Sequence, residues 1–172
     1  QASVKSSGSG ASSSSDTNVQ VEGIDEADFV KNDGEYIYFV SDNKVYIIDG
    51  YPGEDIEIVS EISLDENVYP ENLFIYNDKL VIFNRVNKER FGVSEYNFMP
   101  ITRYDSFTQI VVYDIANKEK PKSVEEFEID GNYNEARLSG GIVYLVSRDD
   151  IYWNYAEVSS PEIWRGGERI MS

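Results

Sequence analysis

The stretch "TQIVVYDIANKEKPKSVEEFEIDG" at 108–131 repeats the pattern of an earlier stretch, "NKVYIIDGYPGEDIEIVSEISLD" at 43–65. Asp49 in the earlier stretch matches Asp114 in the later one, and Asp65 matches Asp130; both pairs are 65 positions apart. The chain therefore contains an internal repeat, and the period of a repeat indicates the structural unit that it encodes.

The second copy of the repeat carries an insertion. Asp33 and Asp49 are 16 positions apart, whereas the matching Asp78 and Asp114 are 36 apart. An insertion of 20 residues within 84–107 accounts for the difference and leaves a repeat of 45 residues. That period is typical of a four-stranded propeller blade, which takes about 40 to 50 residues.

Each copy divides into four segments in which apolar side chains recur at every second position, as at Tyr36, Tyr38 and Val40. This alternation predicts strands, and no stripe of helical period is present. Asp33-Gly34, Asp42-Asn43 and similar pairs between the segments supply turn chemistry. The sequence therefore predicts an all-β fold, an incomplete β-propeller of four-stranded antiparallel blades with about two and a half blades in this chain.

The predicted organisation starts with a flexible Ser/Gly-rich linker over 1–16. A partial propeller over 17–172 then divides into a closing outer strand (17–22), blade 1 (23–66), blade 2 (67–130, with the insertion 84–107) and the start of blade 3 (131–172). So few blades leave unpaired strand edges and an uncovered apolar face. We expect the missing blades to come from the rest of a longer protein, the favoured interpretation, or from another chain.

Composition excludes several classes of function. The formal net charge is −17, so the chain should repel nucleic acid and anionic membrane surfaces. With no cysteine and no histidine, it has no disulfide, no thiolate nucleophile, no zinc site of the usual kind and no Ser-His-Asp triad. No apolar run approaches the roughly 20 residues that span a bilayer, so we expect no direct membrane insertion.

Three runs carry a family resemblance: "NVQVEGIDEADFVKNDGEYIYFVSDNKVYIIDGYP", "VYPENLFIYNDKLVIF" and "VVYDIANKEKPKSVEEFEIDG". Together they resemble the family of secreted prokaryotic proteins with a C-terminal β-propeller domain, distantly WD40-like, and "VEGIDEADFVKNDG" is the most specific portion. The resemblance implies export from an archaeal or bacterial cell, an extracellular location, secreted or tethered to the cell surface, and a propeller several times longer than this chain. It assigns no catalytic residue.

Three glutamates, Glu26, Glu71 and Glu135, open the first strand of successive copies. First strands line a propeller's central channel, so these carboxylates are expected to converge, and crowded carboxylates raise one another's pKa unless a cation relieves them. Oxygen ligands suit calcium, which is the candidate cofactor, with Asp25, Asp28, Glu71 and Glu135 as its candidate ligands. The alternative is that each glutamate caps a loop or stays solvated.

Aromatic residues in two long segments are the other binding candidates: Tyr96 and Phe98 in the insertion, Trp153 and Trp164 near the end. Such rings stack on sugars or anchor a protein partner when exposed, and otherwise pack their loops onto the body. The repeated Asp49, Asp114, Asp65 and Asp130 are explained by Asx turns at strand ends.

The function predicted from these features is a non-catalytic extracellular interaction or scaffold module that binds a protein or glycan partner. The alternative is a polysaccharide-acting enzyme that uses channel-facing carboxylates, with calcium as a candidate cofactor. A third class is a structural repeat that only builds a cell envelope. These classes differ in their outcome, since an interaction module binds without turnover, an enzyme turns its ligand over, and an envelope repeat does neither.

Overall fold

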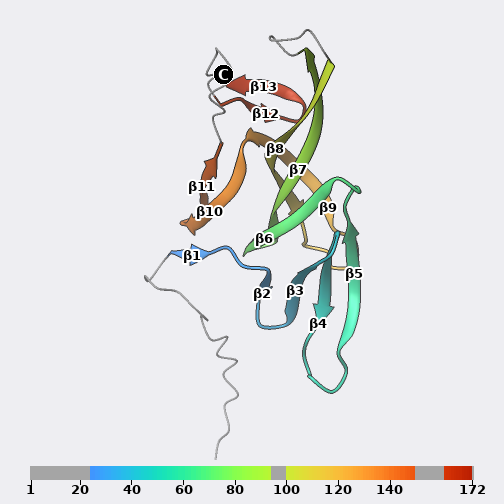
Figure 1. Cartoon of the computed structure of the whole chain (residues 1–172). Helices are drawn as coiled ribbons and strands as arrows, with labels where there is room; N and C mark the ends of the chain where they lie inside the picture. The colour runs from blue at the N-terminus through green and yellow to red at the C-terminus, as the bar shows by residue number, and fades with distance from the viewer. Residues whose placement is uncertain (1–23, 94–99, 150–160, 172) are drawn as a thin grey trace, which may run out of the picture.

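A computed structural model describes residues 24–93, 100–149 and 161–171, and every regular element in these ranges is a strand (Figure 1). The all-β prediction is therefore confirmed. The predicted linker 1–16 and closing strand 17–22 lie outside the described residues. The strands are β1 (Asp25–Glu26), β2 (Val30–Asn32), β3 (Tyr36–Ser41), β4 (Lys44–Asp49), β5 (Glu57–Ser63), β6 (Val68–Tyr76), β7 (Lys79–Val93), β8 (Pro100–Asp114), β9 (Lys122–Asp130), β10 (Asn132–Ser139), β11 (Ile142–Arg148), β12 (Ile163–Arg165) and β13 (Glu168–Met171).

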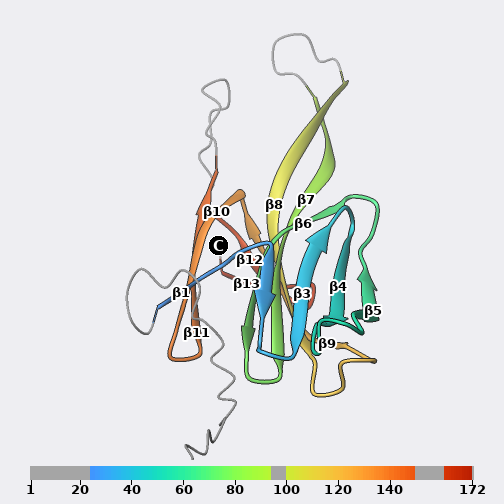
Figure 2. The ribbon, with the colours of Figure 1, turned by 90° about the horizontal axis from the view of Figure 1, so that it is seen from below.

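The strands form three antiparallel sheets that lie side by side (Figure 2). The first sheet has the order β2-β3-β4-β5, the second has β6-β7-β8-β9 extended by β12 and β13, and the third has β1-β10-β11. The first two sheets each contain a four-stranded meander of consecutive strands. Neighbouring four-stranded meanders packed face to face, with the ring not closed, are the arrangement of an incomplete propeller.

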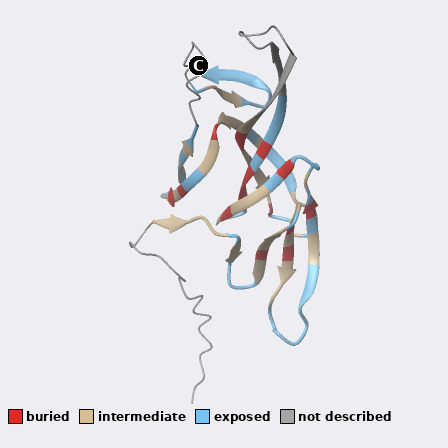
Figure 3. Cartoon of the chain, viewed as in Figure 1, coloured by how far each residue is buried: buried red, intermediate tan, exposed pale blue. Residues whose placement is uncertain are grey.

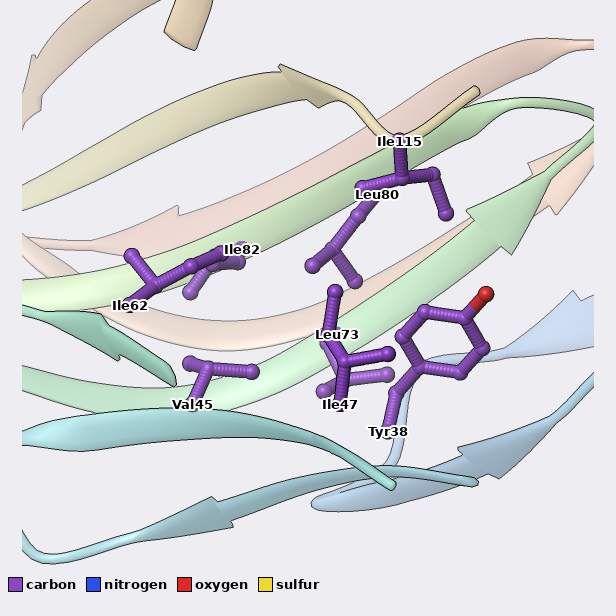
Figure 4. Close-up of a cluster of buried hydrophobic side chains, with 8 residues drawn as sticks. All are labelled: Tyr38, Val45, Ile47, Ile62, Leu73, Leu80, Ile82 and Ile115. Atoms are coloured by element: carbon purple, nitrogen blue, oxygen red, sulfur yellow. The ribbon is translucent and has the colours of Figure 1, made fainter. Parts of the chain in front are cut away.

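The second sheet buries apolar side chains on both of its faces, because successive residues of a strand point to opposite sides. Leu80 and Ile82 of β7 face the first sheet, whereas Val81 and Phe83 face the third. Figure 3 shows the buried residues concentrated where the sheets face one another. Most of them form two clusters, and Figure 4 shows the one that lies between the first and second sheets. The cluster against the first sheet consists of Tyr38, Val45, Ile47, Ile62, Leu73, Leu80, Ile82 and Ile115. The cluster against the third consists of Phe74, Val81, Phe83, Ala136 and Leu138.

Turn chemistry follows the sequence closely. Asp42 and Asn77, in the turns that follow β3 and β6, have φ of 53° and 51°, a conformation that Asp and Asn tolerate better than most residues. The Asx-turn prediction is confirmed at Asp49 and Asp114, whose Oδ1 atoms accept from the N–H two residues on, at 3.2 and 3.0 Å. Asp130 differs, because its carboxylate accepts from the distant Glu162 N–H at 2.8 Å.

We had expected the insertion 84–107 to be a loop. In its described part it is instead an extension of the β7–β8 hairpin. The two strands pair without interruption from Lys79 opposite Asp114 to Val93 opposite Pro100. Cross-strand pairing satisfies the backbone groups of both added segments, which a long irregular loop leaves to water. The segments are also rich in branched and aromatic residues, which favour strands.

The end of the chain joins the second sheet, whereas we had assigned it to the start of blade 3. Strand β12 pairs antiparallel with β9, and β13 pairs with β12. Arg165 makes two hydrogen bonds to the carboxylate of Glu125 at 2.9 and 2.7 Å and so fastens β12 to β9. The attachment covers the outer edge of β9, whose backbone groups are otherwise unpaired on that side.

One segment, residues 24–32, crosses the inner edges of all three sheets and is called the inner segment below. Its β1 pairs with β10 of the third sheet, Asp28 bridges to Leu73 of the second, and β2 pairs with β3 of the first (Figure 2). We had expected this stretch to belong to blade 1 alone. Its backbone groups instead find partners in three successive blades.

Apolar side chains also cover the outward face at each end of the stack. On the first sheet Ile37, Phe39, Tyr46 and Ile48 alternate with the buried residues of β3 and β4, and Ile58, 62% exposed, lies beside Ile48. On the third sheet Ile142, Tyr144 and Val146 are 58%, 57% and 55% exposed. These two surfaces are called the end faces.

Candidate functional site

The inner-edge glutamates come from three strands, and the structure brings two of them together. Glu26 on β1 and Glu135 on β10 both form ion pairs with Arg137, at 3.0 Å for Glu26 and in closer contact for Glu135. Residues 135 and 137 share a face of β10, since they are two apart in a strand. A side chain of the protein thus supplies positive charge between these two carboxylates.

Glu71, the third of these glutamates, pairs instead with Arg85 at 3.8 Å. Burial raises the pKa of Glu71 above its ordinary value, and the charge of Arg85 opposes that shift. Burial also raises the pKa of Tyr133, and hydrogen bonds with Asn72 and Ala136 oppose that shift. The pair of Glu71 with Arg85 is therefore separate from the pairs that Arg137 makes with Glu26 and Glu135.

The remaining candidate metal ligands have partners within the protein. Asp25 pairs with Lys31 at 2.7 Å, and Asp28 accepts from the N–H of Phe29 at 2.8 Å. Within the ranges that the structure describes, no three acidic side chains are grouped so that they could hold a metal ion. The three glutamates thus form ion pairs with arginines, an arrangement that differs from the loop capping or solvation weighed from the sequence, and the calcium site stays a prediction.

Of the four aromatic candidates, the structure describes Trp164, which lies half-buried on β12. Tyr96, Phe98 and Trp153 lie outside the residues whose side chains are described. Trp164 lines a pocket of ≈ 400 Å³ on the outer part of the second sheet, and this is called the Trp164 pocket below. It is lined by Lys88, Glu126, Phe127, Glu128, Trp164, Gly166 and Gly167.

The polar walls of the Trp164 pocket are held by hydrogen bonds. Glu126 Oε1 accepts from Gln109 Nε2 at 2.8 Å, and Glu128 Oε1 accepts from the Lys88 ammonium. Lys88 also lies over the ring of Phe107, with its Nζ 4.8 Å from the centroid. These contacts hold the side chains of Lys88, Glu126 and Glu128 in place.

Sequence reasoning found Trp164 but missed the charged residues around it. Lys88 lies in the insertion and meets Glu128 only because β7 extends past the end of the simple hairpin. Arg137 was also missed, although its position two residues after Glu135 was a usable signal. The Gly166-Gly167 pair was a second signal, since adjacent glycines between short apolar runs indicate a tight hairpin.

Comparison with known proteins places the chain. Residues 14–166 match the model of the beta propeller domain family. An uncharacterized protein of Methanocaldococcus jannaschii is 33% identical over 145 residues, which cover 81% of this chain and 19% of that protein. An uncharacterized protein of Archaeoglobus fulgidus is 31% identical over 157 residues, covering 83% and 20%. The chain thus spans about a fifth of the length of these relatives, and no solved structure matches it.

Proposed function

The chain belongs to the beta propeller domain family, and we propose that it serves as a non-catalytic interaction module on the outside of the cell, binding a protein or glycan partner. Propellers present loops and outer strands on a rigid body, a construction that suits binding. The observation that carries the proposal is the enlargement of the second sheet. The long β7–β8 hairpin lengthens this sheet, and the β12–β13 hairpin adds two strands beside β9. The Trp164 pocket lies between the extended part of β7 and the added strand β12.

Two features support the extracellular location. The N-terminal stretch 1–16 is Ser/Gly-rich, as expected for a spacer between the propeller and an anchor or another domain. The sequence also resembles secreted prokaryotic propeller proteins. In the described ranges the structure has no helix with the length and apolarity needed to cross a lipid bilayer.

The end faces support further blades as partners. Exposed Ile, Tyr and Val side chains gathered on one sheet face are typical of a surface that another element covers. The relatives are about five times as long as the matched region, which leaves room for additional blades. We propose that each end face packs against a neighbouring blade, supplied by the rest of a longer protein or by another chain.

Binding without turnover is the test of the interaction module. The chain is immobilised and screened against soluble polysaccharides and a displayed peptide library, and bound ligands are recovered and analysed for cleavage. We expect saturable binding, intact ligand, and affinity about tenfold weaker for Trp164→Ala. The control Tyr51→Ala, on a loop of the first sheet and 74% exposed, should bind as the unaltered chain does. Absence of any ligand of either class refutes the proposal.

One observation favours the second candidate, a polysaccharide-acting enzyme. The pKa of Glu71 is raised by burial beside Arg85, a combination found at catalytic acids. Against it, the Trp164 pocket contains none of the three inner-edge glutamates. Turnover of any polysaccharide that is abolished by Glu71→Gln and retained by Trp164→Ala establishes the enzyme and overturns the interaction module.

A further inference from the structure

We propose that the Trp164 pocket binds one pyranose ring of a neutral saccharide, with the indole of Trp164 as the surface on which the sugar stacks. This inference rests on the proposed function and names the ligand class of the same surface. The pocket volume of ≈ 400 Å³ lies in the range of small-molecule sites, about 300 to 1,000 Å³.

The apolar side of the pocket suits the C–H face of a sugar. Trp164 lines it, whereas the ring of the other aromatic lining residue, Phe127, lies on the opposite face of the sheet beneath Arg165. An indole by itself offers a large flat contact area at little cost in conformational entropy. A Cβ atom built at Gly166 or Gly167 meets no atom within 4 Å, so the turn between β12 and β13 leaves open space on that side. A pyranose chair approaching the indole past this turn therefore meets no side chain from either glycine.

The polar side of the pocket suits hydroxyl groups. A carboxylate can accept about four hydrogen bonds, so Glu126 and Glu128 keep acceptor capacity beyond the bonds from Gln109 and Lys88. The Lys88 ammonium, with three donors, can donate to a sugar oxygen while it keeps its bond to Glu128. Acceptors and a donor placed around an aromatic surface match a ligand whose hydroxyls both donate and accept.

Charge selects against the other ligand classes. Two carboxylates in the pocket and a net charge of −17 on the chain repel uronic acids, phosphates and sulfated sugars. A cationic side chain of a protein can pair with Glu126, but the Lys88 ammonium in the same pocket repels it and already pairs with Glu128. A neutral ring meets neither repulsion, and so it fits the pocket best.

Tryptophan fluorescence provides the test, because the chain has two tryptophans. In the Trp153→Phe variant, emission reports Trp164 alone. The variant is titrated with neutral hexaoses of glucose, mannose and N-acetylglucosamine, and in separate arms with oligogalacturonate and penta-lysine. We expect a saturable change with at least one neutral hexaose, and none with the charged probes at equal concentration.

Matched variants separate stacking from folding. By calorimetry, Trp164→Ala should weaken binding of the responding hexaose about tenfold, Trp164→Phe less, and Glu126→Gln by a few fold, while Tyr51→Ala leaves it unchanged. Circular dichroism checks that each variant is folded. If Trp164→Ala unfolds, Trp164→Phe replaces it in the comparison, because phenylalanine keeps an aromatic ring in β12. The inference is overturned by no response to any neutral hexaose, by affinity in Trp164→Ala and Glu126→Gln equal to that of the unaltered chain, or by preference for a charged probe. If a peptide binds instead, the interaction module stands; turnover of the sugar defeats both.

Discussion

Asp28 and Leu73 exchange two main-chain hydrogen bonds, at 3.3 Å from Asp28 N to Leu73 O and at 2.8 Å in the other direction. The side chain of Leu73 is at the same time fully buried between the first and second sheets. The main chain of Leu73 therefore holds the inner segment, while its side chain packs between two blades. This double role makes Leu73 the most informative position for stability.

We expect Leu73→Ala to lower the free energy of unfolding by about 2 to 5 kcal/mol, because it removes buried methyl groups and leaves a cavity. Urea unfolding followed by circular dichroism measures the loss. Ile58→Ala is the matched control, since Ile58 is 62% exposed on an end face, and it should change stability by about 0.5 kcal/mol or less. Equal losses in the two variants contradict blade-on-blade packing as the source of stability.

Gly131 connects β9 to β10 with φ of 91°, and a Cβ atom there would lie 2.7 Å from the carbonyl oxygen of Arg148. Gly131→Ala should therefore cost more than about 1 kcal/mol, from an unfavourable φ and a backbone clash together. Thermal unfolding measures the effect. At Gly53 a Cβ meets nothing within 4 Å, so Gly53→Ala should be neutral or slightly stabilising. An unchanged melting temperature in Gly131→Ala would show that the β9–β10 turn differs from the one described.

The raised pKa of Glu71 predicts a specific pH dependence. Because burial raises its folded pKa above the ordinary value of 4.5, the folded state binds the proton more tightly than the unfolded state. The resulting stability is present at low pH and is lost as pH rises from about 4.5 through the raised pKa. Glu71→Gln removes this loss, so its stability relative to the unaltered chain should increase between pH 4 and pH 7. Urea unfolding across this range measures the difference, and parallel curves refute the shift.

Arg137 should contribute more to the free energy of unfolding than most surface side chains, because it forms ion pairs with two carboxylates at once. Arg137→Met leaves Glu26 and Glu135 without their shared cation, and we expect a loss of roughly 1 kcal/mol that shrinks in 1 M NaCl. Glu135→Gln added to Arg137→Met should restore part of the loss by removing one negative charge. Denaturation of the single and double variants at two salt concentrations tests this. No recovery in the double variant would mean that the two glutamates do not repel each other.

Local patterns in the sequence predicted the strands and turns well. The alternation at Tyr36, Tyr38 and Val40 marks β3, and the match of Asp49 with Asp114 marks the same Asx turn in two blades. Both features depend on residues close together in the chain. Local chemistry determines them, so a single sequence suffices to find them.

Pairings between distant segments were not predictable in this way. The attachment of β12 to β9 depends on contacts such as Asp130 with Glu162, which are 32 positions apart and leave no periodic mark. The Trp164 pocket depends on the same attachment and on Lys88, 40 positions before Glu128. The inner segment was misassigned for a related reason, because no residue pattern shows that one short stretch pairs with three sheets.

The two end faces do not resemble each other. One presents Phe39, Tyr46 and three isoleucines, and the other presents Ile142, Tyr144 and Val146 beside the charged Glu135 and Arg137 of β10. A unit whose ends differ has a direction, so further blades packed against both ends would follow one another head to tail. Head-to-tail joining produces a closed ring when the rotation between units divides a full turn, and an open filament when it does not. The angle between adjacent blades thus governs whether assembly stops.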